Sequence, residues 1–142
     1  MPLQFIAQVH RATHRIGLHI ERLGAPGVTQ AEAHILAHLD AAGPSTIAEV
    51  HRAFAHKRST LTSILDRLER RGFIERTTDA RDRRTFVVRL TRAGKPLARR
   101  VSRHLESLEA RVLRRASARD VRALLTVLEA LEAEAEGARE QE

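Results

Sequence analysis

Apolar residues recur every three or four positions through most of the chain, a spacing that places them on one face of an α-helix. The spacing predicts helices over residues 3–23, from the cap at Thr29 to the break at Gly43-Pro44, from Thr46 to about Phe54, over 58–71, over 92–115, and from Ser117 to about 136. Thr29 with Glu32 and Thr46 with Glu49 have capping-box spacing, which supports helix starts at both places.

The apolar period changes to two in the middle of the chain. Residues 73–78 and 85–90 read as strands, and the charged segment 79–84 between them reads as the tip of a hairpin. The predicted order is four helices, two strands and two helices. This is a mainly α fold with a small β-hairpin: a winged helix-turn-helix core with long N- and C-terminal helices.

The long terminal helices carry more apolar face than a small winged-helix core can cover, which favours dimerisation through them. The predicted division is an N-terminal dimerisation helix in 1–28, a DNA-binding domain in 29–91 and C-terminal dimerisation helices in 92–142.

The net charge of +7, with 25 Lys and Arg against 18 Asp and Glu, suggests a polyanionic partner. The excess is concentrated between residues 56 and 92, where eleven cations face five acids, a local surplus of six. The chain has no Cys, which excludes disulfides and thiolate chemistry, and it lacks the common catalytic motifs, so no enzyme is expected. No apolar run reaches the ~18 residues of a membrane span and the start is not a signal peptide, so a cytoplasmic protein without membrane contact is expected.

The segment 58–71 is the predicted recognition helix. With its leucines turned inward it presents short hydroxyls and cations, which suit base edges and phosphates in the major groove. The tip 79–84 suits the minor groove. The candidate DNA contacts are Lys57, Arg58, Ser59, Thr60, Thr62, Ser63, Arg67, Arg81, Arg83 and Arg84. Asp79 and Asp82 are expected to support the tip, with Asp82 holding Arg84 while Arg81 and Arg83 reach the DNA.

Several segments carry a resemblance to a known family: Thr29-Gln30-Ala31-Glu32, Ser59-Thr60-Leu61-Thr62, Gly72-Phe73-Ile74, and the wing Asp79-x-Arg81-Asp82-x-Arg84 followed by Leu90-Thr91 and Gly94. With these residues the chain resembles the MarR family of winged-helix transcriptional regulators. The resemblance implies a two-fold dimer built by interlocking terminal helices, palindromic double-stranded operator DNA as partner, and a ligand-responsive regulator, most often a repressor.

The resemblance also implies an effector pocket where the first, second and long fifth helices meet. A small organic anion is the expected effector, with no cofactor, and its candidate contacts are Arg11, His14, His38, Arg100 and His104. A metal- or haem-responsive regulator is the alternative, because His10 with His14 and His34 with His38 form i, i+4 pairs. An architectural DNA binder without effector also remains open.

Overall fold

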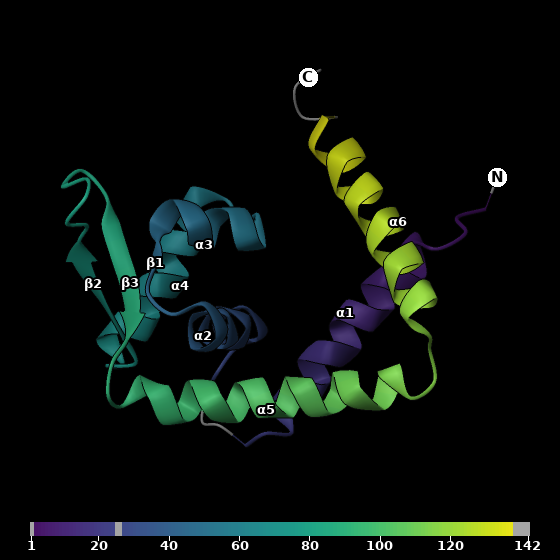
Figure 1. Ribbon diagram of the computed structural model, residues 1–142, viewed down its shortest axis with the longest axis horizontal. Coiled ribbons are helices and arrows are strands. Elements are labelled where there is room, and N and C mark those ends of the chain that lie inside the picture. Colours follow the sequence, from purple (N-terminus) through teal and green to yellow (C-terminus); the bar gives the residue numbers. More distant parts are fainter. Residues whose placement is uncertain (1, 25–26, 138–142) are drawn as a thin grey trace. The chain divides into compact units, whose positions relative to one another are not determined.

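A computed structural model describes residues 2–24 and 27–137 of the chain (Figure 1). The chain divides into two compact units, Met1–Leu105 and Glu106–Glu142. The elements in chain order are α1 (Ile6–Glu21), α2 (Gln30–Ala42), β1 (Ser45–Thr46), α3 (Ile47–Phe54), α4 (Arg58–Arg70), β2 (Ile74–Thr78), β3 (Phe86–Leu90), α5 (Gly94–Leu113) and α6 (Ala118–Gly137).

The mainly helical winged-helix fold predicted from the sequence is confirmed, and the predicted helices and strands differ from the observed ones by at most three residues at their ends. The prediction that the sheet has only two strands is wrong. The sheet has three strands in the order β1-β3-β2, all antiparallel, because Ser45 and Thr46 pair with Val88 and Val87. A strand of two residues is too short to show an alternating pattern, so only the tertiary pairing reveals it.

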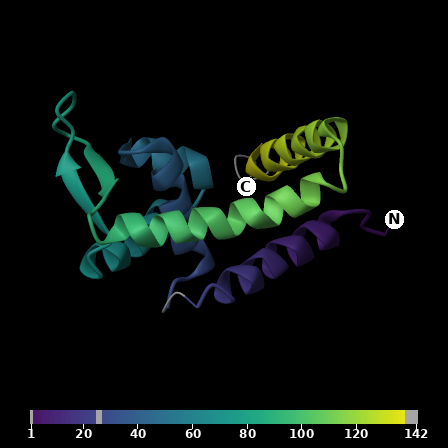
Figure 2. The ribbon, with the colours of Figure 1, turned by 60° about the horizontal axis from the view of Figure 1, so that its bottom comes forward.

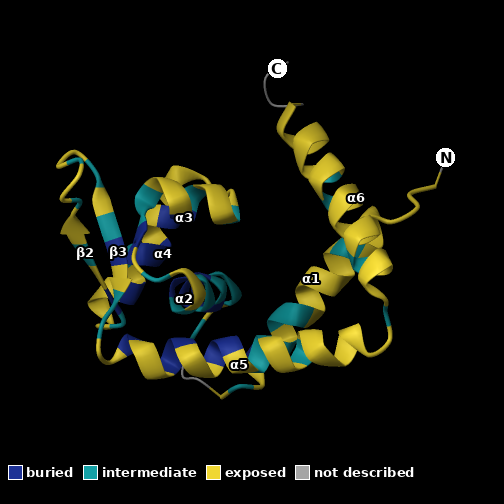
Figure 3. Ribbon diagram, viewed as in Figure 1, coloured by how far each residue is buried: buried dark blue, intermediate teal, exposed yellow. Residues whose placement is uncertain are grey.

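The core of the first unit lies among α2, α4, the sheet and the start of α5 (Figure 3). Leu36, Leu65 and Val88 are each at most 1% exposed. Ile20 of α1 and Val101 of α5 are buried in the same core. The expected boundaries at residues 28 and 91 therefore do not separate compact units, because the terminal helices complete the winged-helix core.

Two glycines determine how α4, the hairpin and α5 connect. Gly72 ends α4 with a φ of 78°, a left-handed conformation that a side chain disfavours. At Gly94 a Cβ atom would overlap the carbonyl oxygen of Phe73. The first turn of α5, capped by Thr91 Oγ1 on the Gly94 N–H at 3.0 Å, thus packs directly on the backbone that follows α4.

The second unit contains the end of α5 and α6. Ser117 and Asp120 cap α6 reciprocally, with Ser117 N donating to Asp120 Oδ2 at 2.8 Å and Asp120 N donating to Ser117 Oγ at 3.1 Å. None of the α6 residues is buried. Leu124 and Leu125 are more than half exposed. In the described part of the chain, no helix has the length and apolarity needed to cross a bilayer.

Candidate nucleic-acid interface

Helix α4 turns one face to the core and the other to solvent, as the sequence predicts. Leu61, Ile64, Leu65 and Leu68 are buried, whereas Ser59, Thr60, Thr62 and Ser63 are exposed. Ser63 Oγ donates to the Ser59 carbonyl at 3.0 Å, so that hydroxyl is partly used within the helix. The exposed hydroxyls of Thr60 and Thr62 make no side-chain hydrogen bond in the described residues.

The start of α4 differs from the starts of α2 and α3. Thr29 and Thr46 each accept a hydrogen bond from the backbone of the helix that they precede. At α4 the corresponding residue is Lys57, and within the described residues no side chain caps the first turn. Unpaired backbone N–H groups and the helix dipole at this end favour an anion, and the exposed cations Lys57 and Arg58 add to that field.

Arg67, expected among the DNA contacts, is engaged inside the protein. Its Nε lies 3.5 Å from Oε1 of Glu32, a carboxylate on α2 that is only 3% exposed. Arg71 lies 3.4 Å from Oε2 of the same carboxylate, and the Thr29 hydroxyl donates to Oε1 at 3.1 Å. Glu32 therefore does not complete the reciprocal capping box at Thr29. Glu32 joins α2 to α4 instead. The sequence does not predict this ion pair, because the apolar pattern of α4 places Arg67 on its exposed face.

A second ion-pair cluster occupies the far end of α4. Arg76 of β2 donates from Nη2 to Asp66 and from Nε to Glu69, both at 2.6 Å. Partial burial alone would lower the pKa of Arg76, but the hydrogen bonds to Glu69 and Asp66 outweigh it and raise that pKa. This cluster is not among the contacts predicted from the sequence. The sequence carries one sign of it: Asp66 and Glu69 are three positions apart and therefore lie on the same side of α4.

The tip of the wing is built by its two aspartates. Asp79 Oδ1 accepts from the backbone N–H of Arg81 at 3.0 Å. Asp82 Oδ1 accepts from both the backbone N–H and the Nε of Arg84, each at 3.1 Å. The expected Arg84–Asp82 pair is thus present, and these hydrogen bonds lower the pKa of Asp82. Arg81 and Arg83 are exposed and have no side-chain partner in the described residues.

These pairings divide the charges of the central segment into two groups. The acids Asp66, Glu69 and Asp82 are each held by an arginine of the same unit. Seven exposed cations of the segment 56–92 have no side-chain partner within the described residues: Lys57, Arg58, Arg70, Arg81, Arg83, Arg89 and Arg92. Four of these seven lie at the start of α4 and at the tip of the wing, the two places predicted to contact DNA.

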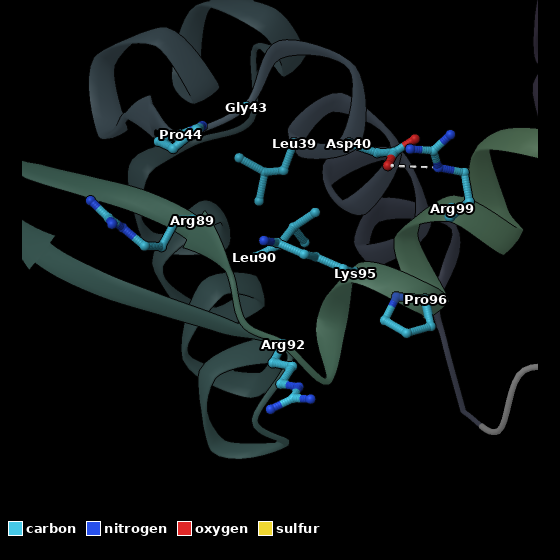
Figure 4. Close-up of a pocket in the computed structure, with 10 residues that line it drawn as sticks. All are labelled: Leu39, Asp40, Gly43, Pro44, Arg89, Leu90, Arg92, Lys95, Pro96 and Arg99. Atoms are coloured by element: carbon cyan, nitrogen blue, oxygen red, sulfur yellow. Dashed lines mark ion pairs between the residues drawn. The ribbon is translucent and has the colours of Figure 1, made fainter.

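The five residues expected to form an effector pocket lie on three different helices, α1, α2 and α5. Arg11 and His14 are exposed on α1. His38 packs its ring edge against Phe54, with ring centroids 5.5 Å apart, and its Nε2 is buried without a partner. The cavity of about 740 Å³ at the base of the wing, between the end of α2, the end of β3 and the start of α5, is lined by other residues (Figure 4). The predicted effector pocket stays a prediction.

The two remaining residues of that prediction lie where α1 runs beside α5 (Figure 2). Arg100 reaches the Leu23 carbonyl at 3.4 Å. His104 stacks on His19 at 3.9 Å between ring centroids and contacts the His19 carbonyl at 2.6 Å. His19 was not among the predicted residues, because it follows His14 by five positions and so lacks the i, i+4 spacing of the predicted pairs.

The histidines of the metal alternative do not form a metal site. His10 and His14 are exposed, and among residues 2–24 and 27–137 no three His, Asp or Glu side chains gather as metal ligands would. His34 is half-buried, and burial lowers its pKa. An i, i+4 histidine pair supplies two ligands at most, and here no third side chain joins either pair.

Comparison with known proteins agrees with this architecture. Residues 27–85 match the profile of the MarR family. The HTH-type transcriptional repressor MdtR of Bacillus subtilis (strain 168) is 35% identical over 75 residues, which are 53% of this chain and 48% of the repressor. The chain thus spans about half the length of this curated relative.

Solved structures share the fold over nearly the whole chain. MepR of S. aureus in its DNA-binding conformation has a TM-score of 0.81 and 20% identity, with 93% of this chain and 98% of MepR covered. The PcaV transcriptional regulator of Streptomyces coelicolor, in complex with its natural ligand, has a TM-score of 0.73 and 21% identity, with 95% and 99% covered.

Proposed function

We propose that the chain, whose residues 27–85 match the MarR family, is a ligand-responsive, dimeric transcriptional repressor of double-stranded operator DNA. In this proposal α4 enters the major groove and the wing tip, residues 79–84, enters the adjacent minor groove. MdtR, a transcriptional repressor, and MepR, solved in a DNA-binding conformation, support the assignment.

One observation carries the DNA-binding surface: the start of α4 and the tip of the wing each carry two exposed cations without a partner among the described residues, while Asp66, Glu69 and Asp82 are each paired with an arginine. Lys57 and Arg58 would contact phosphate beside the uncapped first turn of α4. The exposed hydroxyls of Thr60 and Thr62 would reach base edges. Asp82 would keep Arg84 against the turn, so that Arg81 and Arg83 extend toward the groove.

The proposal of a dimer rests on apolar surface that a single chain leaves exposed. In the second unit, Val112, Leu113, Leu124, Leu125 and Val127 are 44–55% exposed. Exposed apolar side chains on a segment, residues 106–137, that has no buried residue indicate an interaction surface, and a second copy of the chain would cover it. Two copies would present two α4 helices, and the operator would then be a pseudo-palindrome with half-sites about 10 bp apart, or a multiple of this spacing.

The experiment begins by selecting DNA fragments from a random pool with the full chain and sequencing them. The affinity for the selected duplex and for random duplex is then measured by fluorescence anisotropy at one salt concentration. A specific regulator should prefer the selected duplex by about 10³-fold or more, whereas an architectural binder should show little preference. Sedimentation of the full chain should show a dimer, and a concentration-independent monomer would contradict the proposal.

The wing is tested by the double variant Arg81→Ala/Arg83→Ala. It should lower the affinity for the selected duplex by at least tenfold and reduce the salt dependence of binding. Arg22→Ala/Arg103→Ala is the matched control, because it removes two exposed arginines, one at the C-cap of α1 and one in the middle of α5. Equal affinities for the wing variant and the control would exclude the wing from the DNA-binding surface.

A further inference from the structure

An exposed aromatic side chain stands on the wing, in the hairpin of β2 and β3 (Figure 1). Phe86, the first residue of β3, is 51% exposed. Every other large apolar side chain that is exposed in the described part of the chain lies in residues 3–18 or 112–127. Those segments include the helices expected to form the dimer. Phe86 lies outside them, so the proposed dimer contact does not account for its exposure.

The pairing of β2 with β3 shows which way the Phe86 ring faces. Phe86 lies opposite Thr78, and two positions further along β3, Val88 lies opposite Arg76. Opposed residues, and alternate residues along one strand, point to the same side of a sheet. On this side Arg76 forms its ion pairs with α4 and Val88 is completely buried. The ring therefore lies on the side of the hairpin that faces α4, beyond the edge of the core.

Hydrogen bonds close the turn that precedes Phe86. The Asp79 N–H donates to the Thr85 carbonyl at 2.9 Å, and the Thr85 N–H donates to the Asp82 carbonyl at 3.1 Å. The Thr85 hydroxyl donates to the same carbonyl at 3.1 Å. These bonds fix the start of β3 against the tip of the wing. The Phe86 ring thus has a defined place beside the proposed phosphate contact Arg83, which precedes it by three residues.

The two proposed DNA contacts place one strand of the duplex between them. Helix α4 would enter the major groove and the wing tip the adjacent minor groove, and these grooves are separated by a sugar-phosphate backbone. The charge of this backbone resides on its phosphates, whereas the deoxyribose rings present mostly C–H groups. A duplex held at both places therefore brings deoxyribose rings to the side of the hairpin that faces α4, where the Phe86 ring is exposed.

We propose that Phe86 packs against a deoxyribose ring of the strand that divides the two grooves. This contact rests on the proposed function, and it adds an apolar contact to a surface of cations and hydroxyls. Minor-groove proteins also insert Phe side chains between base pairs. The direction of the ring, toward α4, favours the sugar over such an insertion. Contacts to the backbone orient a protein on the duplex without reading bases, so Phe86 would set how α4 and the wing sit on the DNA.

The first test compares the affinity of Phe86→Thr and of the unmodified chain for the selected and the random duplex over a series of salt concentrations. Threonine keeps the preference for a strand but removes the ring. The affinity for both duplexes should fall at least about fivefold, because part of an aromatic ring stays in water at each half-site. The two losses should agree within about twofold, since the sugars are the same in every sequence.

The salt dependence separates this contact from those of the arginines. The slope of log affinity against log salt should stay unchanged in Phe86→Thr, because an apolar contact releases no counterion, whereas Arg81→Ala/Arg83→Ala should reduce it. An unchanged affinity of Phe86→Thr for the selected duplex would overturn the proposal. A loss confined to the selected duplex would indicate insertion between base pairs and would also overturn the sugar contact.

Two further variants separate the ring from the stability of the hairpin. Phe86→Leu retains an apolar side chain and should bind both duplexes within about threefold of the unmodified chain. Thr77→Ala is the matched control, because Thr77 is exposed on the same hairpin and lies next to Thr78, on the opposite side of the sheet. It should bind normally. A loss in Thr77→Ala as large as that in Phe86→Thr would assign the effect to the hairpin and refute the proposal.

The integrity of the wing tip is checked on the free chain. The backbone N–H groups of Arg81 and Arg84 donate to Asp79 and Asp82, so their amide resonances report the structure of the tip. Both resonances should be unchanged in Phe86→Thr. A change there, together with a reduced salt slope, would show that the ring acts by holding the arginines rather than by touching DNA.

Hydroxyl-radical footprinting locates the contact, because the radical cleaves DNA at exposed deoxyribose rings. At saturating protein, Phe86→Thr should lose the protection of about one or two sugars at the boundary of the two grooves in each half-site, and the rest of the footprint should persist. An identical footprint would overturn the proposal. Failure of the proposed function is distinguishable: no duplex would then be preferred over random DNA, whereas the sugar contact is refuted when a preferred duplex is found and Phe86→Thr binds it normally.

Discussion

The Glu32→Gln substitution replaces the buried carboxylate that joins α2 to α4 with an amide of the same shape. The carboxylate is 3% exposed and meets Arg67 at 3.5 Å, Arg71 at 3.4 Å and the Thr29 hydroxyl at 3.1 Å. Removing one partner of a fully buried pair costs about 3–5 kcal/mol. Here the cost should be smaller, because the side chains of Arg67 and Arg71 are 45% and 33% exposed and water can solvate them.

The expected loss in the free energy of unfolding is about 1–2 kcal/mol, the lower part of the range for hydrogen bonds to charged groups. Urea unfolding of the full chain, followed by circular dichroism at one fixed protein concentration, measures it. Glu75→Gln is the matched control. Glu75 is exposed on β2 and has no side-chain bond in the described residues, so its substitution should change stability by less than about 0.5 kcal/mol.

A double-mutant cycle with Arg67→Gln separates the pair from its surroundings. Arg67→Gln alone should cost about 0.5 kcal/mol, since Arg67 is half exposed. The coupling between the two substitutions should be about 0.5–1 kcal/mol. If Glu32→Gln were as stable as the unmodified chain, or the cycle showed no coupling, the carboxylate would not join α2 to α4 energetically and the reasoning would be refuted.

Three further predictions concern the fold and its titratable groups. Gly94→Ala should lower the free energy of unfolding by at least about 2 kcal/mol in urea, because its Cβ would overlap the Phe73 carbonyl; a stability equal to that of the unmodified chain would show that α5 can shift at no cost. Burial lowers the pKa of His34 below 6.5, so His34 binds a proton more readily in the unfolded chain than in the folded one. The free energy of unfolding should therefore fall as pH decreases through 6.5. His34→Gln should reduce this pH dependence, and identical pH profiles of the two proteins would contradict the prediction. The hydrogen bonds from Arg84 lower the pKa of Asp82 below 3.8, so the pair persists above that value and is lost as pH falls through the lowered pKa; the Arg84 amide resonance should stay constant from pH 8 to 5, and a titration within that range would contradict the pairing.

The sequence by itself determined the elements whose causes are local. The stripe of Leu61, Ile64, Leu65 and Leu68 predicts a helix with one buried face, because side chains three and four positions apart share a side. The interleaved charges of the wing predict the Arg84–Asp82 pair, whose cause is also local, because the two residues are only two positions apart. The net charge of the chain likewise follows from its sequence alone, because it is a sum over residue types.

Only the tertiary structure decided which distant charges meet. Glu32 joins Arg67 across 35 positions of sequence and Arg76 joins Asp66 across ten, and no periodicity relates such residues. The same holds for β1, whose two residues become a strand only because β3 lies beside them. It holds most clearly for the cavity at the base of the wing. Its cations come from β3, from the segment that follows it and from α5, its acid comes from α2, and these residues line one cavity only because the fold brings these elements together.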